Sequence, residues 1–455
     1  MAERRRELFG GRSAAILAMA GSAIGLGNIW RFPYMVGQTG GAAFIILYLV
    51  CCLLLSLPIF LAEAIIGHRT HAGTFGAMER LAPGTKWKWL GLLTVLSPLV
   101  ILSYYSVVGG WSMDYLWRSL TTGFHAHEIG AVSSAFGDFI SSPWAPLLCH
   151  TLFLGGCAWI VSAGVKSGIE KFNKITMPLL FVLIVVIMGY SLTLPGSATG
   201  VTYMLKPDFS KITPSAVAAA MGQSFFSLSL GVGTILTYAS YVHEKENILV
   251  TGLGTVGFDL LFALIAGFAI MPAVFAAGIE PGAGPGLIFE TLPYIFAKMG
   301  ASVPWLSAVV AVLFFVTIVF AAFTSAISMF EVGVAYLVEQ RGFSRRRATL
   351  FIFAATWALG ALCSLSFGPL SGVKLFGRTI FSFCDFLTSN FLMTFGGLLF
   401  VLFVGWKMDR TAVRDEFTCG GSARLNCAVF DAFWFLLRYI APPAIVIIFI
   451  TNFFA

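Results

Sequence analysis

Charged residues are scarce in this sequence. Asp, Glu, Lys and Arg together make up 11% of its 455 residues, whereas a soluble globular protein carries about 25%. Hydrophobic residues make up 58%, so the chain has too little polar surface for a soluble domain. The Gly-x4-Gly-Lys-Ser/Thr motif that cradles nucleotide phosphates is also missing. These absences argue for a protein within a membrane and against an ATP-driven machine of the P-loop type.

Long apolar runs take the place of the missing charge. A helix needs about 20 such residues to cross the hydrocarbon core of a bilayer, and we therefore expect an all-α membrane protein. Eleven spans are predicted, at residues 12–36, 41–67, 89–120, 144–163, 172–193, 214–241, 247–278, 303–339, 346–367, 376–405 and 429–454.

Basic residues are missing from some of the predicted loops. The loop at 121–143 contains no Lys or Arg, whereas basic clusters occupy alternate loops at residues 4–12, 69–88, 166–174, 341–347 and 407–424. Because basic loops stay in the cytoplasm, we expect a cytoplasmic N-terminus and an external C-terminus. These loops account for the net charge of +7, so no nucleic-acid partner is expected. No predicted external loop carries an Asn-x-Ser/Thr acceptor, which favours a bacterial inner membrane over a glycosylated eukaryotic surface.

The first predicted span contains residues that disfavour a continuous helix. Gly21, Gly25 and Gly27 fall within seven residues and are followed by Asn28 and Arg31. A second Gly-rich interruption lies at 222–234, five spans later. Two interrupted spans at corresponding positions are typical of transporters built from inverted repeats, with the binding site at the breaks. Helix packing through small residues is the alternative for any single glycine.

This pairing predicts two five-helix repeats. We expect a cytoplasmic N-terminal segment at 1–11, a first repeat at 12–193, a second, inverted repeat at 214–405, a cytoplasmic loop at 406–428 and an eleventh helix at 429–455.

Five segments resemble one known family, the neurotransmitter:sodium symporters, in the right order and on the right predicted helices. They are GSAIGLGNIWRFPY (21–34), ILSYYSVVGGW (101–111), SFFSLSLGVGTILTYASY (224–241), FAAFTSAIS (320–328) and CDFLTSN (384–390). The resemblance covers nearly the whole chain and is closest to the bacterial amino-acid transporters with eleven helices. It implies a LeuT-type five-plus-five inverted repeat with broken helices 1 and 6, plus an eleventh helix.

The resemblance also implies two sodium sites made of hard oxygen ligands, which suit a hard cation. The first would use Ala23, Asn28, Ser227 and Asp259, with Ala23 contributing its carbonyl. The second would use the carbonyls of Gly21, Ile24 and Ala321 with the hydroxyls of Thr324 and Ser325. For those two hydroxyls, a hydrogen bond back to their own helix is the alternative.

Asp259 departs from the family pattern, because many relatives have Asn at this position. A carboxylate within a membrane is costly unless paired, so it is a candidate functional residue. Some bacterial relatives use a carboxylate where chloride-dependent members bind the anion, and we therefore expect no chloride requirement. The alternative is an Asp solvated in a transient water-filled cavity.

Gly25 indicates the substrate class, since monoamine-transporting relatives have Asp there and amino-acid transporters have Gly. With no carboxylate from the protein, the ligand is expected to supply its own. The substrate-binding set implied by position is Ala23, Gly25, Leu26, Gly27, Ile101, Tyr105, Phe226, Ser229, Val232, Ser325 and Met329. It carries no charge, and Val232 replaces an aromatic residue of several relatives. A neutral amino acid with a large apolar side chain, such as Leu, Phe or Trp, is therefore expected.

The remaining matched residues resemble the family's gates. Arg31 and Asp385 match an outer ion pair. Arg6 and Glu339 match a cytoplasmic closing pair, supported by Ser240 and Tyr241, and Phe9 replaces the usual Trp, which predicts looser closure there. Without the family match, Arg6 would simply extend to the membrane interface.

The predicted function is thus Na⁺-coupled symport of neutral L-amino acids by alternating access. The sequence leaves open an amino-acid sensor on the same fold and a Na⁺-coupled transporter of another small zwitterion. A channel would need a continuous polar lining, and an enzyme would need a nucleophile and base near the breaks, where none of the six His residues falls. Membrane lipid is an expected partner, and the sequence indicates no oligomeric state.

Overall fold

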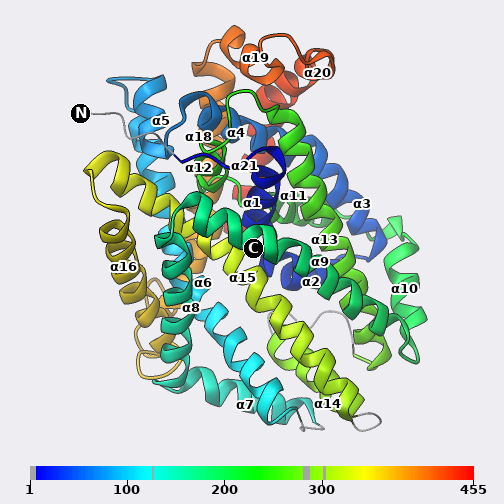
Figure 1. Ribbon diagram of the computed structural model, residues 1–455. Coiled ribbons are helices and arrows are strands. Elements are labelled where there is room, and N and C mark those ends of the chain that lie inside the picture. Colours follow the sequence, from blue (N-terminus) through cyan, green and yellow to red (C-terminus); the bar gives the residue numbers. More distant parts are fainter. Residues whose placement is uncertain (1–6, 125–127, 280–286, 301–303, 455) are drawn as a thin grey trace.

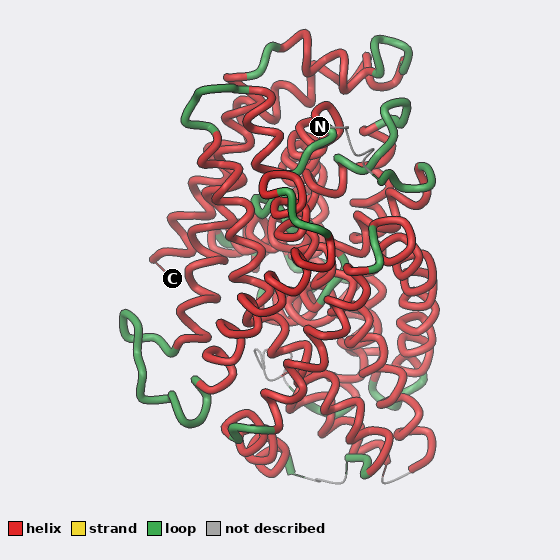
Figure 2. Tube along the Cα trace, turned by 60° about the vertical axis from the view of Figure 1, so that its left-hand side comes forward, coloured by secondary structure: helices red, strands yellow, loops and turns green. Residues whose placement is uncertain are grey.

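The computed structural model describes residues 7–124, 128–279, 287–300 and 304–454. Within these ranges the chain is helical throughout, apart from loops and one isolated bridge between Leu375 and Arg378. The helices form a single bundle of crossing rods (Figures 1 and 2).

The N-terminal part of the bundle extends to residue 192, and short π-helical segments (η) interrupt several of its helices. Its elements are α1 Arg12–Ala23, η1 Gly27–Arg31, α2 Phe32–Gln38, α3 Ala42–Cys51, η2 Cys52–Ser56, α4 Leu57–Thr70, α5 Thr74–Leu81, α6 Lys88–Thr121, α7 Ile129–Ser141, α8 Ala145–Ser162, η3 Val165–Glu170 and α9 Lys171–Leu192.

The C-terminal part contains one 3₁₀ turn, η4, and four further π-helical segments. Its elements are α10 Ser197–Leu205, η4 Phe209–Lys211, α11 Pro214–Ser227, α12 Thr234–Ala239, α13 Ile248–Ala276, η5 Leu287–Thr291, α14 Leu292–Gly300, α15 Pro304–Arg341, α16 Arg345–Leu365, α17 Ile380–Phe386, η6 Leu387–Leu392, α18 Met393–Leu402, η7 Phe403–Lys407, α19 Arg410–Thr418, α20 Arg424–Phe435, η8 Leu436–Ile440 and α21 Ala441–Phe454.

Most predicted spans are single long helices. Among the described residues, nine helices are long and apolar enough to cross a membrane, and the pair formed by 12–23 and 27–38, bent by 57°, forms a tenth span. The predicted sixth span is divided between α11 and α12 by residues 228–233. The two predicted interruptions are therefore the places where the helices break.

The two ends of the bundle carry different short helices (Figure 1). We call the end that carries α5 and α19, near residues 7–9, the α19 end. The end that carries α7 and α14 is called the α14 end. Helix α1 begins at the α19 end, and η1 with α2 continues from the break toward the α14 end.

The segment 406–428, predicted as a cytoplasmic loop, contains α19 and the start of α20. Asp409 caps α19 by accepting a hydrogen bond from the amide of Ala412 at 3.0 Å, and the buried Val413 and Phe417 attach the helix to the bundle. Helices α5, α7, α10 and α14 also lie between the predicted spans. Such helices are too short to give the long apolar run by which spans are found.

Candidate substrate and cation site

The first break brings the backbone of α1 against two other helices. Helix α1 ends at Ala23, Ile24 is extended, and the chain becomes helical again at Gly27. A Cβ added to Gly25 would lie 2.5 Å from Ser325 Oγ and 3.0 Å from Tyr105 Oη. The absence of a side chain at Gly25 permits this close approach, so the break exposes backbone groups directly to α6 and α15.

The second break depends on unusual backbone angles and one buried carboxylate. Ser229 has φ 51°, which is uncommon for a residue with a side chain and is typical of strained functional segments. Gly231 has φ 80°, and a Cβ there would lie 2.0 Å from the carbonyl oxygen of Met393. Its amide donates to Glu63 Oε1 at 2.7 Å, and Glu63 is fully buried on α4. Glu63 therefore holds the unwound segment in place.

A cavity of about 410 Å³ lies where the two breaks meet. This volume is in the range of small-molecule sites. All eleven residues of the predicted substrate-binding set line it, and so do Arg31 and Asp385. The lining continues past the break to Trp30, Tyr34 and Ser389, which lie toward the α14 end. The structure thus brings the predicted substrate residues together in one space.

Three residues of the predicted first cation site form a buried polar cluster. Asn28 Nδ2 donates to Asp259 Oδ1 at 2.7 Å and to Ser227 Oγ at 3.2 Å, while Ser227 Oγ donates to Asp259 Oδ2 at 2.9 Å. Asn28 Oδ1 accepts from the amide of Gly25 at 3.2 Å. Asp259 is fully buried, so its carboxylate lies within the polar cluster and is not solvated at the surface. Ala23 borders the same cavity.

The predicted second cation site gathers hydroxyls of α15 around carbonyls of α1. Thr324 Oγ1 donates to Ile24 O at 3.3 Å and to Ala321 O at 2.9 Å. Ser325 Oγ donates to Ile24 O at 3.2 Å and to Ser22 O at 3.1 Å. The hydrogen bond from Thr324 to Ala321 lies within α15, as the alternative for these hydroxyls predicts. Thr324 and Ser325 nevertheless also donate to carbonyls of the chain at the end of α1. Neutral oxygens that converge in this way suit a hard monovalent cation.

Arg31 and Asp385, which are predicted to form an outer ion pair, both line the cavity. Within the part of the chain that the structure describes, no salt bridge joins Arg31 to Asp385. The Arg31 guanidinium instead lies 4.6 Å from the centre of the Phe226 ring, a cation–π contact. Both residues of the predicted pair therefore line the cavity, but they do not form an ion pair in this structure.

The opposite side of the break is tightly packed. Phe9 is 1% exposed and contacts the rings of Tyr238 and Tyr241 edge-on, with its amide donating to the carbonyl of Tyr241 at 2.9 Å. Glu339 Oε2 accepts from the amide of Gly73 at 2.8 Å. Ser240, which directly precedes Tyr241 in the chain, is fully buried. Arg6, the predicted partner of Glu339, lies outside the described residues.

Several hydrogen bonds to carboxylates on this side are not predicted by the sequence. Glu331 is fully buried, and Arg345 donates to its two carboxylate oxygens at 3.1 and 2.5 Å, while Tyr241 Oη donates at 2.7 Å. Glu7 accepts from the amide of Val165, and Glu170 accepts from the amide of Gly10. The signal that could have found Glu63 and Glu331 is an isolated carboxylate within a long apolar run. Their partners are distant in sequence and gave no local signal.

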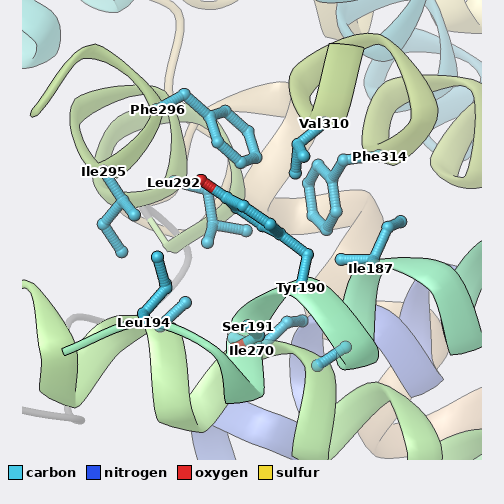
Figure 3. A pocket seen from close by; sticks show the side chains of 12 residues that line it. Ile187, Tyr190, Ser191, Leu194, Ile270, Leu292, Ile295, Phe296, Val310 and Phe314 are labelled. Carbon is cyan, nitrogen blue, oxygen red and sulfur yellow. The ribbon is translucent and has the colours of Figure 1, made fainter. Parts of the chain in front are cut away.

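A second, much smaller cavity, of about 20 Å³, lies between α9, α13, α14 and α15 (Figure 3). Its lining is apolar except for Tyr190 and Ser191, and none of the predicted site residues borders it. This volume suffices for about one water molecule, so the cavity is a packing gap beneath α14 and not a substrate site.

The chain is similar to known transporters over nearly its whole length. A family model described as the sodium:neurotransmitter symporter family matches residues 6–131 and 121–455. An uncharacterized sodium-dependent transporter of Bacillus subtilis (strain 168), YhdH, is 35% identical over 450 residues, covering 99% of this chain and 98% of its own. A sodium-dependent serotonin transporter of Drosophila melanogaster is 27% identical over 511 residues, covering 99% and 77%. The crystal structure of MhsT in complex with L-phenylalanine matches with a TM-score of 0.87 at 41% identity, covering 98% of this chain and 100% of that one.

Proposed function

Because the chain belongs to the sodium:neurotransmitter symporter family, a family of transporters and not of enzymes, we propose that it carries a neutral, large apolar L-amino acid together with Na⁺ across the bacterial inner membrane. The observation that carries this proposal is the cavity at the two breaks, which gathers every predicted substrate residue around Gly25. A wider alternative is a Na⁺-coupled transporter of another small zwitterion.

The substrate carboxylate is proposed to lie at the first break. The helix that begins at Gly27 presents its N-terminal, positive end there, which favours an anion. Tyr105 Oη already accepts a hydrogen bond from the amide of Leu26 at 3.2 Å, so its own proton is available to a ligand. Gly25 leaves no room for a competing side chain.

The substrate side chain is proposed to occupy the apolar part of the cavity. Ile101, Phe226, Val232 and Met329 line this part, and a charged side chain would lose its hydration there without gaining a partner. The L-phenylalanine bound by MhsT, the structural neighbour, fits this chemistry. Aromatic and large aliphatic amino acids are therefore the proposed substrates.

Two Na⁺ ions are proposed to bind beside the substrate, one at each oxygen cluster. Asp259 supplies the first cluster with a negative charge, and this supports transport without chloride. We predict that Asp259→Asn weakens Na⁺ binding at least tenfold or creates a chloride requirement, because it removes the one carboxylate of that cluster. Equilibrium binding of L-[³H]phenylalanine, titrated with Na⁺ in chloride or gluconate, measures both effects. Unchanged Na⁺ dependence in both salts would remove Asp259 from the site.

The ion gradient is large enough to drive uptake. Two charges crossing 100 mV release about 2.3 kcal/mol each, and a tenfold Na⁺ gradient adds about 1.4 kcal/mol per ion. The total of about 7 kcal/mol would sustain roughly a 10⁵-fold substrate gradient if coupling were tight.

Access to the cavity is proposed to alternate between the two ends of the bundle. By the distribution of Lys and Arg, the α19 end is cytoplasmic and the α14 end external. The open contact between Arg31 and Asp385 and the packed Phe9 then correspond to a state that faces outward.

Uptake of L-[³H]phenylalanine into proteoliposomes tests the proposal. An inward Na⁺ gradient is expected to drive accumulation that a K⁺ gradient does not, with chloride and gluconate giving equal rates. Competition by unlabelled amino acids then ranks the substrates. Binding without uptake or counterflow would instead identify a sensor, and uptake independent of Na⁺ would contradict the proposal.

A further inference from the structure

Asn173 on α9 carries a buried amide oxygen without a hydrogen-bond donor. The residue is 1% exposed, and its Nδ2 donates to the carbonyl of Ile169 at 2.9 Å. Its Oδ1 has no partner among the described residues. Buried polar atoms almost always have a hydrogen-bond partner in folded proteins. This oxygen is therefore a candidate to bind a ligand.

The orientation of the amide follows from its surroundings. If the side chain were flipped, Oδ1 would face the carbonyl oxygen of Ile169, and two acceptors would oppose one another. The hydrogen bond from Nδ2 thus fixes Oδ1 on the other side, toward α1.

Oδ1 lies directly against the backbone of α1 at Gly21. A Cβ added to Gly21 would lie 2.1 Å from Asn173 Oδ1 and 3.4 Å from Met177 Sδ. Glycine is therefore the residue that lets Asn173 reach α1 at this level. The Gly21 carbonyl is one of the five oxygens of the proposed second cation site, whose other members follow on α1 and α15.

The proposed second site has no carboxylate, in contrast to the first. Gly21, Ile24 and Ala321 offer carbonyls, and Thr324 and Ser325 offer hydroxyls. In such a neutral site the affinity for a cation depends on how many oxygen dipoles surround it, so one more amide oxygen changes the affinity appreciably.

We propose that Asn173 Oδ1 supplies a further oxygen to the monovalent cation of the second site, directly or through one water molecule. This inference rests on the proposed function, because it presupposes a cation beside Gly21. It adds a residue from α9 to a site otherwise formed by α1 and α15, so the cation links three helices.

Binding of ²²Na⁺ to the purified full-length protein without amino acid tests the inference. Asn173→Ala is expected to raise the half-saturating Na⁺ concentration of one site roughly tenfold, the size of effect seen when a supporting ligand is removed. Asn173→Asp retains the oxygen, adds a charge, and is expected to bind Na⁺ at least as tightly as the wild type. If Asn173→Ala fails to fold, as judged by gel filtration, Asn173→Ser replaces it and is expected to give a smaller shift in the same direction.

Asn426→Ala is the matched control, because Asn426 is also buried but its amide is hydrogen-bonded to Asn247 and to the carbonyl of Phe417. It is expected to leave Na⁺ binding unchanged. Thr324→Val separates the two proposals. If Thr324→Val weakens Na⁺ binding and Asn173→Ala does not, the role of Asn173 is refuted while the second site stands. If neither Thr324→Val nor Asn173→Ala weakens Na⁺ binding, both the second site and the role of Asn173 are refuted. If Asn173→Ala and Asn173→Asp weaken Na⁺ binding equally, Asn173 acts only in packing.

Discussion

The two sides of the helix breaks are built differently. Toward the α14 end, the cavity reaches Trp30 and Ser389, and Arg31 rests on an aromatic ring without an ion pair to Asp385. Toward the α19 end, Phe9 is buried, Glu331 accepts hydrogen bonds from Arg345, and Glu170 accepts from the amide of Gly10. On the α14 side, no ion pair between Arg31 and Asp385 closes the cavity. On the α19 side, several contacts close it, and all of them must break before it can open.

On the closed side, two carboxylates connect the segment before α1 with η3, which leads into α9. Each carboxylate accepts hydrogen bonds from backbone amides of the other segment. Glu7, just before α1, accepts from the amides of Val165 and Lys166 at 2.6 and 3.3 Å, at the start of η3. Glu170, at the end of η3, accepts from the amide of Gly10 at 2.8 Å. Glu7 thus satisfies free amides at the start of η3, while Glu170 binds the segment that precedes α1, so α1 and α9 are expected to separate or close as a pair.

The largest expected effect is a loss of binding on the open side. Gly25→Asp would place a carboxylate beside the substrate carboxylate, and two such groups cannot both stay ionised in a low-dielectric site without a large penalty. We expect no measurable L-[³H]phenylalanine binding in a scintillation proximity assay, with a folded and inserted protein. Gly25→Ala introduces the same Cβ without the charge and is expected to retain weak binding. Wild-type affinity in Gly25→Asp would show that the substrate carboxylate lies elsewhere.

A somewhat smaller effect is expected on the closed side. Glu331→Ala removes a fully buried carboxylate and leaves Arg345, whose side chain is 25% exposed, with the carbonyl of Val161 as a hydrogen-bond partner, which costs about 3 kcal/mol, the lower end of the range for breaking a buried pair. Because this penalty falls on the closed arrangement, we expect apparent substrate affinity to drop about 100-fold or more as the α19 side opens. Substrate binding at saturating Na⁺ measures the change. Asp431→Ala, which breaks an exposed ion pair with Arg410, is the control and should have no effect; an equal loss there would point to general instability.

The smallest effect is expected for the open gate. Since Asp385 makes no ion pair with Arg31 in this state, Asp385→Asn should change equilibrium substrate binding by less than about fivefold. Uptake should slow much more, because closure of the gate needs the pair. Comparing binding with proteoliposome uptake separates the two, and Asp138→Asn on the exposed face of α7 is the control. A 100-fold loss of binding would mean that the gate residues already hold the substrate.

The features that could be predicted from the sequence are those with a local signal. Apolar length predicts the spans, clustered glycines predict the breaks, and the motif resemblance gathers the cavity residues. The fold class and the family are confirmed by the family model and the match to MhsT. The roles of the site residues remain predictions.

What could not be predicted depends on tertiary contacts. Glu63 meets Gly231 across 168 positions, and Glu7 meets Val165 across 158, so neither neighbour appears in any local pattern. The sequence does not predict α19, because its nine residues are largely polar and do not form an apolar run. The contact of Arg31 with the Phe226 ring also has no local signal in the sequence, since the two residues are far apart along the chain.

Alternating access through the one cavity is tested most directly by thiol labelling at its two sides. In a background without the eight native cysteines, Ser389→Cys reports the α14 side and Ser240→Cys, fully buried in this structure, reports the α19 side. With Na⁺ alone, Ser389→Cys should react at least tenfold faster than in K⁺ buffer, while Ser240→Cys should be protected and become reactive when Na⁺ is withdrawn. If the two thiols become reactive and protected together, or if neither responds to Na⁺, the cavity does not open to one side at a time.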